Sequence, residues 1–218
     1  MTAERAHKER VHKERLRGLY AITDENLITE ENFKQSVELA LRGGAKIIQY
    51  RDKSKDEKKR FQQASVLQSL CTDYQATCII NDDIELAKSI NAEGIHLGKE
   101  DVSISHARQV LGDDIIIGIS CYNDLDIAIE AEKNDADYVA FGAMFSSPTK
   151  PDANQASPEL IAIAKKQLSI PICAIGGITE KNIQLVIQQG ADMTAVISCL
   201  FSSSDIKNTA STLSQNFT

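Results

Sequence analysis

Ile-Ile-Ile-Gly-Ile-Ser, residues Ile115–Ser120, is apolar up to its last residue and therefore suits a strand buried on both faces of a parallel sheet. Amphipathic helical sequence flanks it, and this pairing of a strand-like run with a helical stretch occurs eight times without a linker. Strict alternation implies a parallel sheet, and eight units of about 25 residues suit closure into a barrel. We therefore predict an α/β chain with the fold of a single (β/α)8 TIM barrel.

The predicted strands are Gly18–Thr23, Ala45–Tyr50, Thr77–Asn81, Gly94–Gly98, Ile115–Ser120, Tyr138–Gly142, Ile170–Ile175 and Asp192–Ser198. Residues 1–17 precede the first strand and repeat the motif His-Lys-Glu-Arg at His7–Arg10 and His12–Arg15. We predict that residues 1–17 form a short, charged N-terminal helical extension and that residues 18–218 form the barrel domain.

The composition argues against several classes of protein. The formal net charge of −7 disfavours a nucleic-acid partner or an anionic membrane, and no apolar run approaches the roughly 20 residues of a membrane span. The N-terminus lacks the apolar core of a signal peptide. Five cysteines without a CxxC pair fit reduced thiols rather than disulfides or a zinc site. We expect a cytoplasmic protein, and whether it forms a homo-oligomer stays open.

In TIM barrels the active site lies on the loops that follow the strands, so polar residues at strand ends are the candidates. After the second strand, Gln49, Arg51 and Lys53 alternate along the chain. Two cations and an amide at one mouth suit a diphosphate group. A solvated loop rich in lysine and aspartate is the alternative, and the residues alone leave both open.

Carboxylates follow the next two strands, where Asp82 and Asp101 are expected to lie close together because neighbouring parallel strands end side by side. Magnesium is commonly held by one or two carboxylates together with phosphate oxygens, which favours a metal site at this pair. Aspartate also caps helices, and we assign that role to Asp83.

Hydroxyl groups and glycines follow the later strands. Ser120 places a hydroxyl at the mouth, and Ser147–Lys150 lies in a long loop that suits an oxyanion-binding lid. Gly176-Gly177 and Ser198 follow the seventh and eighth strands, where barrels often bind phosphate through backbone N–H groups. No catalytic triad is present, and for His96 a core or surface role is favoured.

With these motifs assembled, the chain resembles the thiamine-phosphate synthase family from Leu19 to about Leu200. The matching stretches are Leu19–Asp24, Gln49–Lys53, Ile80–Asp82, Gly94–Gly98, Glu100-Asp101, Gly118–Ser120, Thr149-Lys150, Ile175–Ile178 and Ala195–Ser198. The resemblance implies a transferase that joins hydroxymethylpyrimidine diphosphate to hydroxyethylthiazole phosphate, giving thiamine phosphate and pyrophosphate with one magnesium ion per subunit.

The resemblance also implies a role for individual residues. The residues implied for the pyrimidine diphosphate are Gln49, Arg51, Lys53, Asn81, Ser120 and Lys150. The residues implied for the thiazole phosphate are Ser147, Thr149, Gly177, Ile197 and Ser198. The residues implied as magnesium ligands are Asp82 and Asp101, and no residue is implied as a covalent nucleophile or general base. The partners implied are therefore small phosphorylated molecules.

Two alternatives remain on the same barrel. One is a thiazole tautomerase-like isomerase, a paralogue thought to use a histidine where this chain has Tyr122; the other is a non-catalytic sensor of phosphorylated ligands. The chain departs from the family pattern at Lys99, at Ser147 and at Cys121-Tyr122.

Overall fold

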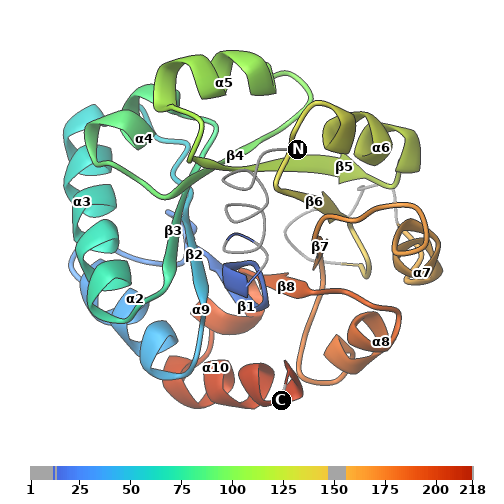
Figure 1. Ribbon diagram of the computed structural model, residues 1–218. Coiled ribbons are helices and arrows are strands. Elements are labelled where there is room, and N and C mark those ends of the chain that lie inside the picture. Colours follow the sequence, from blue (N-terminus) through green and yellow to red (C-terminus); the bar gives the residue numbers. More distant parts are fainter. Residues whose placement is uncertain (1–11, 13, 147–155, 218) are drawn as a thin grey trace.

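The structure is a computed structural model that describes residue 12 and residues 14–146 and 156–217. Eight parallel strands pair in chain order, and β8 pairs with β1, so the sheet is a closed barrel. Figure 1 shows the strands at the centre and the helices around them. The predicted barrel is therefore confirmed.

The strands are β1 (Gly18–Ile22), β2 (Ile47–Tyr50), β3 (Thr77–Asn81), β4 (Gly94–Leu97), β5 (Ile116–Tyr122), β6 (Tyr138–Phe141), β7 (Ile172–Ile175) and β8 (Met193–Val196). The helices are α2 (Phe33–Arg42), α3 (Glu57–Asp73), α4 (Ile84–Ser89), α5 (Ile104–Leu111), α6 (Leu125–Lys133), α7 (Glu159–Ala164), α8 (Ile183–Gln188), α9 (Ser198–Phe201) and α10 (Ile206–Ser214), followed by the 3-10 turn η1 (Gln215–Phe217).

The N-terminal helix predicted for residues 1–17 is not supported. The first element whose bounds the structure gives is β1, and residues 1–11 and 13 lie outside the described part of the chain. Among the described residues, no helix is both long and apolar enough to cross a membrane.

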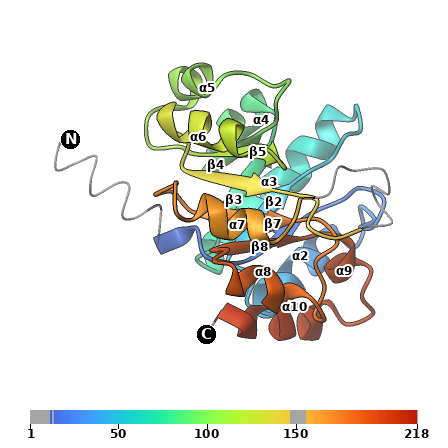
Figure 2. The same cartoon turned by 90° about the vertical axis from the view of Figure 1, so that its right-hand side faces the viewer.

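Two apolar layers follow from the alternation of side chains along each strand. Leu19 and Ala21 of β1 pack outward against the helices, whereas Tyr20 and Ile22 face the barrel interior. Leu16 also belongs to the interior cluster, so the segment before β1 contributes to filling the barrel. Figure 2 shows the molecule from the side, with the arrow of β6 pointing toward the end where α9 lies.

Five helices end in the same turn, which sets where the next strand begins. A residue with positive φ is followed by an alanine whose N–H bonds to the carbonyl five residues earlier, which is the long bond of a Schellman motif. The left-handed residues are Gly44, Gln75, Asn91, Asp135 and Gly190, and the alanine bonds are Ala45 to Ala40, Ala76 to Cys71, Ala92 to Ala87, Ala136 to Ala131 and Ala191 to Val186.

Acidic side chains anchor strand starts at the end of the barrel opposite the strand carboxyl ends. The Asp137 carboxylate accepts hydrogen bonds from the Ile117 N–H at 2.8 Å, from Arg108 Nη2 at 2.7 Å and from His12 Nδ1 at 2.7 Å. Burial alone raises the pKa of the Asp137 carboxyl, but the hydrogen bond from His12 and the charge of Arg108 outweigh it, and the pKa falls below its ordinary value of 3.8.

Asp137→Ala is expected to lower the free energy of unfolding by about 3 kcal/mol, because Arg108 would keep its charge without a carboxylate partner. The depressed pKa fixes the pH dependence: the stabilisation is present above the unfolded pKa and is lost as the pH falls through the lower folded pKa. Urea denaturation from pH 7 downward should therefore show that the difference in free energy of unfolding between wild type and Asp137→Asn becomes smaller below about pH 4. A difference that stays constant with pH would contradict this role.

Candidate active site

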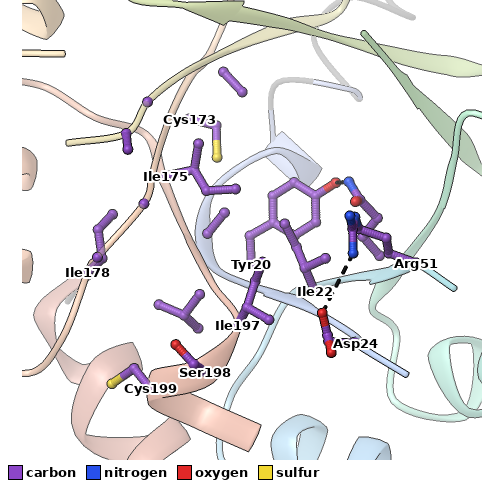
Figure 3. Close-up of a pocket in the computed structure, with 18 of the residues that line it drawn as sticks. Tyr20, Ile22, Asp24, Arg51, Cys173, Ile175, Ile178, Ile197, Ser198 and Cys199 are labelled. Carbon is purple, nitrogen blue, oxygen red and sulfur yellow. Dashed lines mark hydrogen bonds and ion pairs between the residues drawn. The ribbon is translucent and has the colours of Figure 1, made fainter. Parts of the chain in front are cut away.

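A cavity of about 580 Å³ lies at the carboxyl ends of the strands. Figure 3 shows Tyr20 pointing into it, with Arg51 and Asp24 on one side of the ring and Ser198 on the other. The predicted site residues that line this cavity are Gln49, Arg51, Asn81, Ser120, Gly177, Ile197 and Ser198. Ser147, Thr149 and Lys150 lie outside the described residues.

The β1 and β2 side of the cavity presents an amide and a guanidinium. The Gln49 side chain is buried and donates from Nε2 to the Tyr20 hydroxyl at 2.7 Å. Arg51 Nη1 lies 3.6 Å from an oxygen of buried Asp24, and the Arg51 N–H donates to Thr23 Oγ1 at 2.9 Å. These contacts hold the guanidinium at the mouth with its charge only partly compensated.

Lys53 does not line the cavity with Gln49 and Arg51. Its ammonium group forms an ion pair with Asp82, although the Lys53 side chain remains 53% exposed. The alternation predicted for the three residues fails at Lys53 because β2 ends at Tyr50, after which the chain leaves the sheet.

The two predicted metal ligands lie next to each other beside the cavity. Asn81 Nδ2 donates to Asp82 Oδ2 at 2.7 Å, and Gly98 N donates to Asp101 Oδ2 at 2.6 Å. Burial and the neighbouring Asp82 carboxylate raise the pKa of the Asp101 carboxyl, although the Gly98 N–H opposes this shift. Within the described residues, no third histidine, cysteine or acidic side chain joins them as a metal-binding cluster.

Capping does not account for this carboxylate pair. Asp83 caps α4 by accepting from the Leu86 N–H at 2.9 Å, as predicted, and Ser103 caps α5. Asp82 has a φ of 60°, and the Asp101 carboxylate turns back to Gly98. Both aspartates are therefore available for another role.

The opposite side of the cavity is formed after β7 and β8. Gly177 has a φ of 64°, and a Cβ there would lie 2.6 Å from the carbonyl oxygens of Phe145 and Ser146, so only glycine fits. Asn182 Nδ2 donates to the Gly177 carbonyl at 2.9 Å, and Ser198 begins α9. This close packing brings backbone and hydroxyl groups to the mouth.

His96 was missed as a site residue, since a core or surface role was favoured from sequence. It lines the cavity and bonds through Nε2 to Ser120 Oγ and through Nδ1 to the Tyr138 hydroxyl, both at 2.9 Å. The signal available in the sequence was its position two residues after Gly94, on the inward side of β4. Asp24 and Tyr122 also line the cavity and were not predicted.

The arrangement suits two anionic groups bound to one cavity. A guanidinium and amides lie on one side, with two carboxylates next to them that offer hard oxygen ligands to a cation. Glycine and serine lie on the other side, where no side chain with a full positive charge lines the described cavity wall. A nucleophile and a leaving group could thus be held across one space.

Comparison with known proteins agrees with this geometry. The family model described as thiamine monophosphate synthase matches residues 19–200. The thiamine-phosphate synthase of Nitrosococcus oceani is 53% identical over 202 residues, covering 93% of each chain, and that of Thioalkalivibrio sulfidiphilus is 48% identical, covering 94% of this chain and 97% of the other. A solved thiamine phosphate pyrophosphorylase from Pyrococcus furiosus superposes with a TM-score of 0.86 at 33% identity, covering 95% of this chain and 97% of that chain. The chain belongs to the thiamine monophosphate synthase family.

Proposed function

We propose that the chain is a transferase, a thiamine-phosphate synthase, that joins hydroxymethylpyrimidine diphosphate to hydroxyethylthiazole phosphate and releases pyrophosphate. The observation that carries the proposal is one cavity with a cationic, amide-bearing side at β2 and β3 and a glycine-serine side at β7 and β8. Membership of the family, at up to 53% identity to curated synthases, supports the same activity.

We divide the cavity between the two substrates. The residues proposed for the pyrimidine diphosphate are Gln49, Arg51, Lys53, Asn81, Ser120 and Lys150. The residues proposed for the thiazole phosphate are Ser147, Thr149, Gly177, Ile197 and Ser198. The lining of one cavity by members of both sets supports this division.

Asp82 and Asp101 fit a magnesium ion. Two carboxylates close enough to raise the pKa of Asp101 form a hard, negatively charged oxygen donor set, and Asp82 already accommodates the positive charge of Lys53. When bound beside a diphosphate, magnesium would supply Lewis-acid stabilisation of the charge on the leaving oxygens.

The residues of the chain then act by electrostatics and orientation. Arg51 and Lys53 stabilise the negative charge that builds on the departing diphosphate, and Gln49 and Ser120 orient the aminopyrimidine ring. The substitution is dissociative, with positive charge on the pyrimidine methylene shared by the ring. Ser198 and Gly177 hold the thiazole phosphate so that the ring nitrogen faces that methylene. Because this nitrogen is already nucleophilic, no general base is needed.

Purified protein supplied with both substrates and magnesium should release pyrophosphate and form equal amounts of thiamine phosphate, measured by chromatography. If the protein binds both substrates but forms neither product, the proposal of an enzyme is refuted, and a non-catalytic sensor of phosphorylated ligands remains. No observation favours the isomerase alternative, because Tyr122 lines the cavity where that mechanism would place a histidine.

Asp101→Asn should lower kcat/KM by at least about tenfold and raise the magnesium concentration needed for half-maximal rate, because one charged ligand is lost. Asp83→Asn is a matched control: it removes a neighbouring charge, and asparagine still caps α4. Steady-state rates over a magnesium titration check both variants. Equal magnesium dependence in the two would remove Asp101 from the metal site.

Ser198→Ala should raise the KM for the thiazole phosphate by about tenfold, which is the loss expected for one hydrogen bond to a charged group. The KM for the pyrimidine diphosphate should stay within about twofold of wild type, as should both constants in Ser65→Ala, which changes a partly exposed serine of α3 outside the cavity. If both KM values rose together in Ser198→Ala, the division of the cavity would be wrong.

We also propose that residues 18–218 form one barrel domain with residues 1–17 as an extension, and that the enzyme acts in the cytoplasm. All five cysteines are free thiols, which suits a reducing compartment. Oligomeric state can be measured by light scattering, and a homo-oligomer is compatible with the proposed activity.

A further inference from the structure

We propose that three buried side chains, Tyr20, Tyr138 and His96, are positioning residues that link two cavity residues, Gln49 and Ser120. The link determines which of the two cavity residues accepts a hydrogen bond from the ligand and which donates one. Through this coupling the cavity selects an amino-substituted pyrimidine ring over the ring with an oxo group in place of the amine. The inference rests on the proposed function and adds a determinant of specificity to it.

The three side chains form one continuous hydrogen-bonded chain across the barrel. Gln49 Nε2 donates to the Tyr20 hydroxyl at 2.7 Å, and the Tyr20 and Tyr138 hydroxyls lie 2.9 Å apart. The Tyr138 hydroxyl lies 2.9 Å from His96 Nδ1, and His96 Nε2 lies 2.9 Å from Ser120 Oγ. Strands β1, β2, β4, β5 and β6 each contribute one member, so the chain links walls of the cavity that are remote in sequence.

Burial isolates the middle of this chain from solvent. Tyr138 is fully buried, Tyr20 is 1% exposed and His96 is 9% exposed. His96 stacks on Tyr138 with ring centroids 5.6 Å apart. Space for Tyr138 depends on Gly118, because a Cβ at that position would lie 2.0 Å from the tyrosine ring. The three middle groups must therefore satisfy one another.

Each middle group carries one hydrogen on its linking atoms at neutral pH. Both His96 nitrogens bond to hydroxyl groups and neither bonds to a carboxylate, so the buried imidazole is neutral with a single N–H. Burial also raises the pKa of the Tyr20 and Tyr138 hydroxyls, so both stay protonated. With one hydrogen per group, all the bonds of the chain must run in the same direction.

The direction follows from Gln49. Since its amide N–H donates to Tyr20, Tyr20 donates to Tyr138, and Tyr138 donates to His96 Nδ1. His96 then donates from Nε2 to Ser120. The Gln49 carbonyl oxygen is left as an acceptor for the cavity, and the Ser120 hydroxyl keeps its own hydrogen to donate.

This polarity matches an aminopyrimidine. The exocyclic amine donates to the Gln49 carbonyl, and a ring nitrogen accepts from the Ser120 hydroxyl. An oxo group would face the Gln49 carbonyl with a second acceptor. If the Gln49 amide turned to donate instead, every bond in the chain would reverse and Ser120 would give its hydrogen to His96. The ring nitrogen next to an oxo group carries a hydrogen of its own, so the discrimination acts at the other ring nitrogen, which would lose its donor.

The test replaces one hydroxyl in the middle of the chain. Tyr138→Phe keeps the ring and leaves both cavity residues in place, and Tyr50→Phe is the matched control, because Tyr50 is a buried tyrosine whose hydroxyl bonds to Gln63 outside the cavity. Relative kcat/KM is measured with hydroxymethylpyrimidine diphosphate and with its 4-oxo analogue. The preference for the amino substrate should fall by about tenfold in Tyr138→Phe and stay unchanged in Tyr50→Phe.

A double-mutant cycle separates coupling from loss of packing. Tyr20→Phe should reduce the preference as much as Tyr138→Phe does, and the double variant should reduce it no further, because one break already uncouples the ends. Unchanged preference in both single variants that retain the wild-type fold, or additive losses, would overturn the inference. Tyr20→Phe also serves as the single variant if Tyr138→Phe does not fold.

Failure of the proposed function would give a different result. If wild type released no pyrophosphate, calorimetry with the two pyrimidine diphosphates would still measure the preference. Loss of that preference in Tyr138→Phe would then support the coupled chain while the proposed reaction failed. Pyrophosphate release by wild type, combined with an unaltered preference in Tyr138→Phe, would support the proposed reaction and refute the coupled chain.

Discussion

Hydrogen bonding between β1 and β8 closes the sheet, and this closure determines which side chains can reach the active site. The register from Gly18 opposite Met193 to Ala21 opposite Val196 fixes the rotation of both strands. Alternate residues must then enter a confined interior, which apolar side chains such as Leu16 fill. Only the last one or two inward residues of a strand line the cavity, so each strand contributes few groups to the chemistry.

The confined interior also explains how a polar chain can be buried there. Two tyrosines and a histidine fit because their neighbours are small: Gly118 lies against the Tyr138 ring, and Ala140, Cys173 and Ala195 occupy other inward positions. Each buried polar atom of the chain finds a partner in another, so the cost of its desolvation is offset. The two ends of the chain, Gln49 and Ser120, thereby line the cavity.

The strands could be predicted from the sequence because each is a local apolar run. Thr77–Asn81 was predicted with its observed bounds, whereas the fifth strand continues beyond Ser120 to Tyr122, where an irregular register alters the pairing with β6. Helix capping separated Asp83 from Asp82, since a cap is also a local signal. His96 could not be identified in this way, because its partners Ser120 and Tyr138 are 24 and 42 residues away in the chain.

A protein with a net charge of −7 can attract anions to one end only if its cations are held there. Four of the cations that follow β2 are paired with a carboxylate: Arg51 with Asp24, Lys53 with Asp82, Lys59 with Asp52, and Arg60 with Asp83. Pairs as exposed as Lys53 with Asp82 contribute little to stability. Their consequence is orientation: the positive charges are in place before a ligand arrives, so less reorganisation is needed when negative charge develops in the cavity.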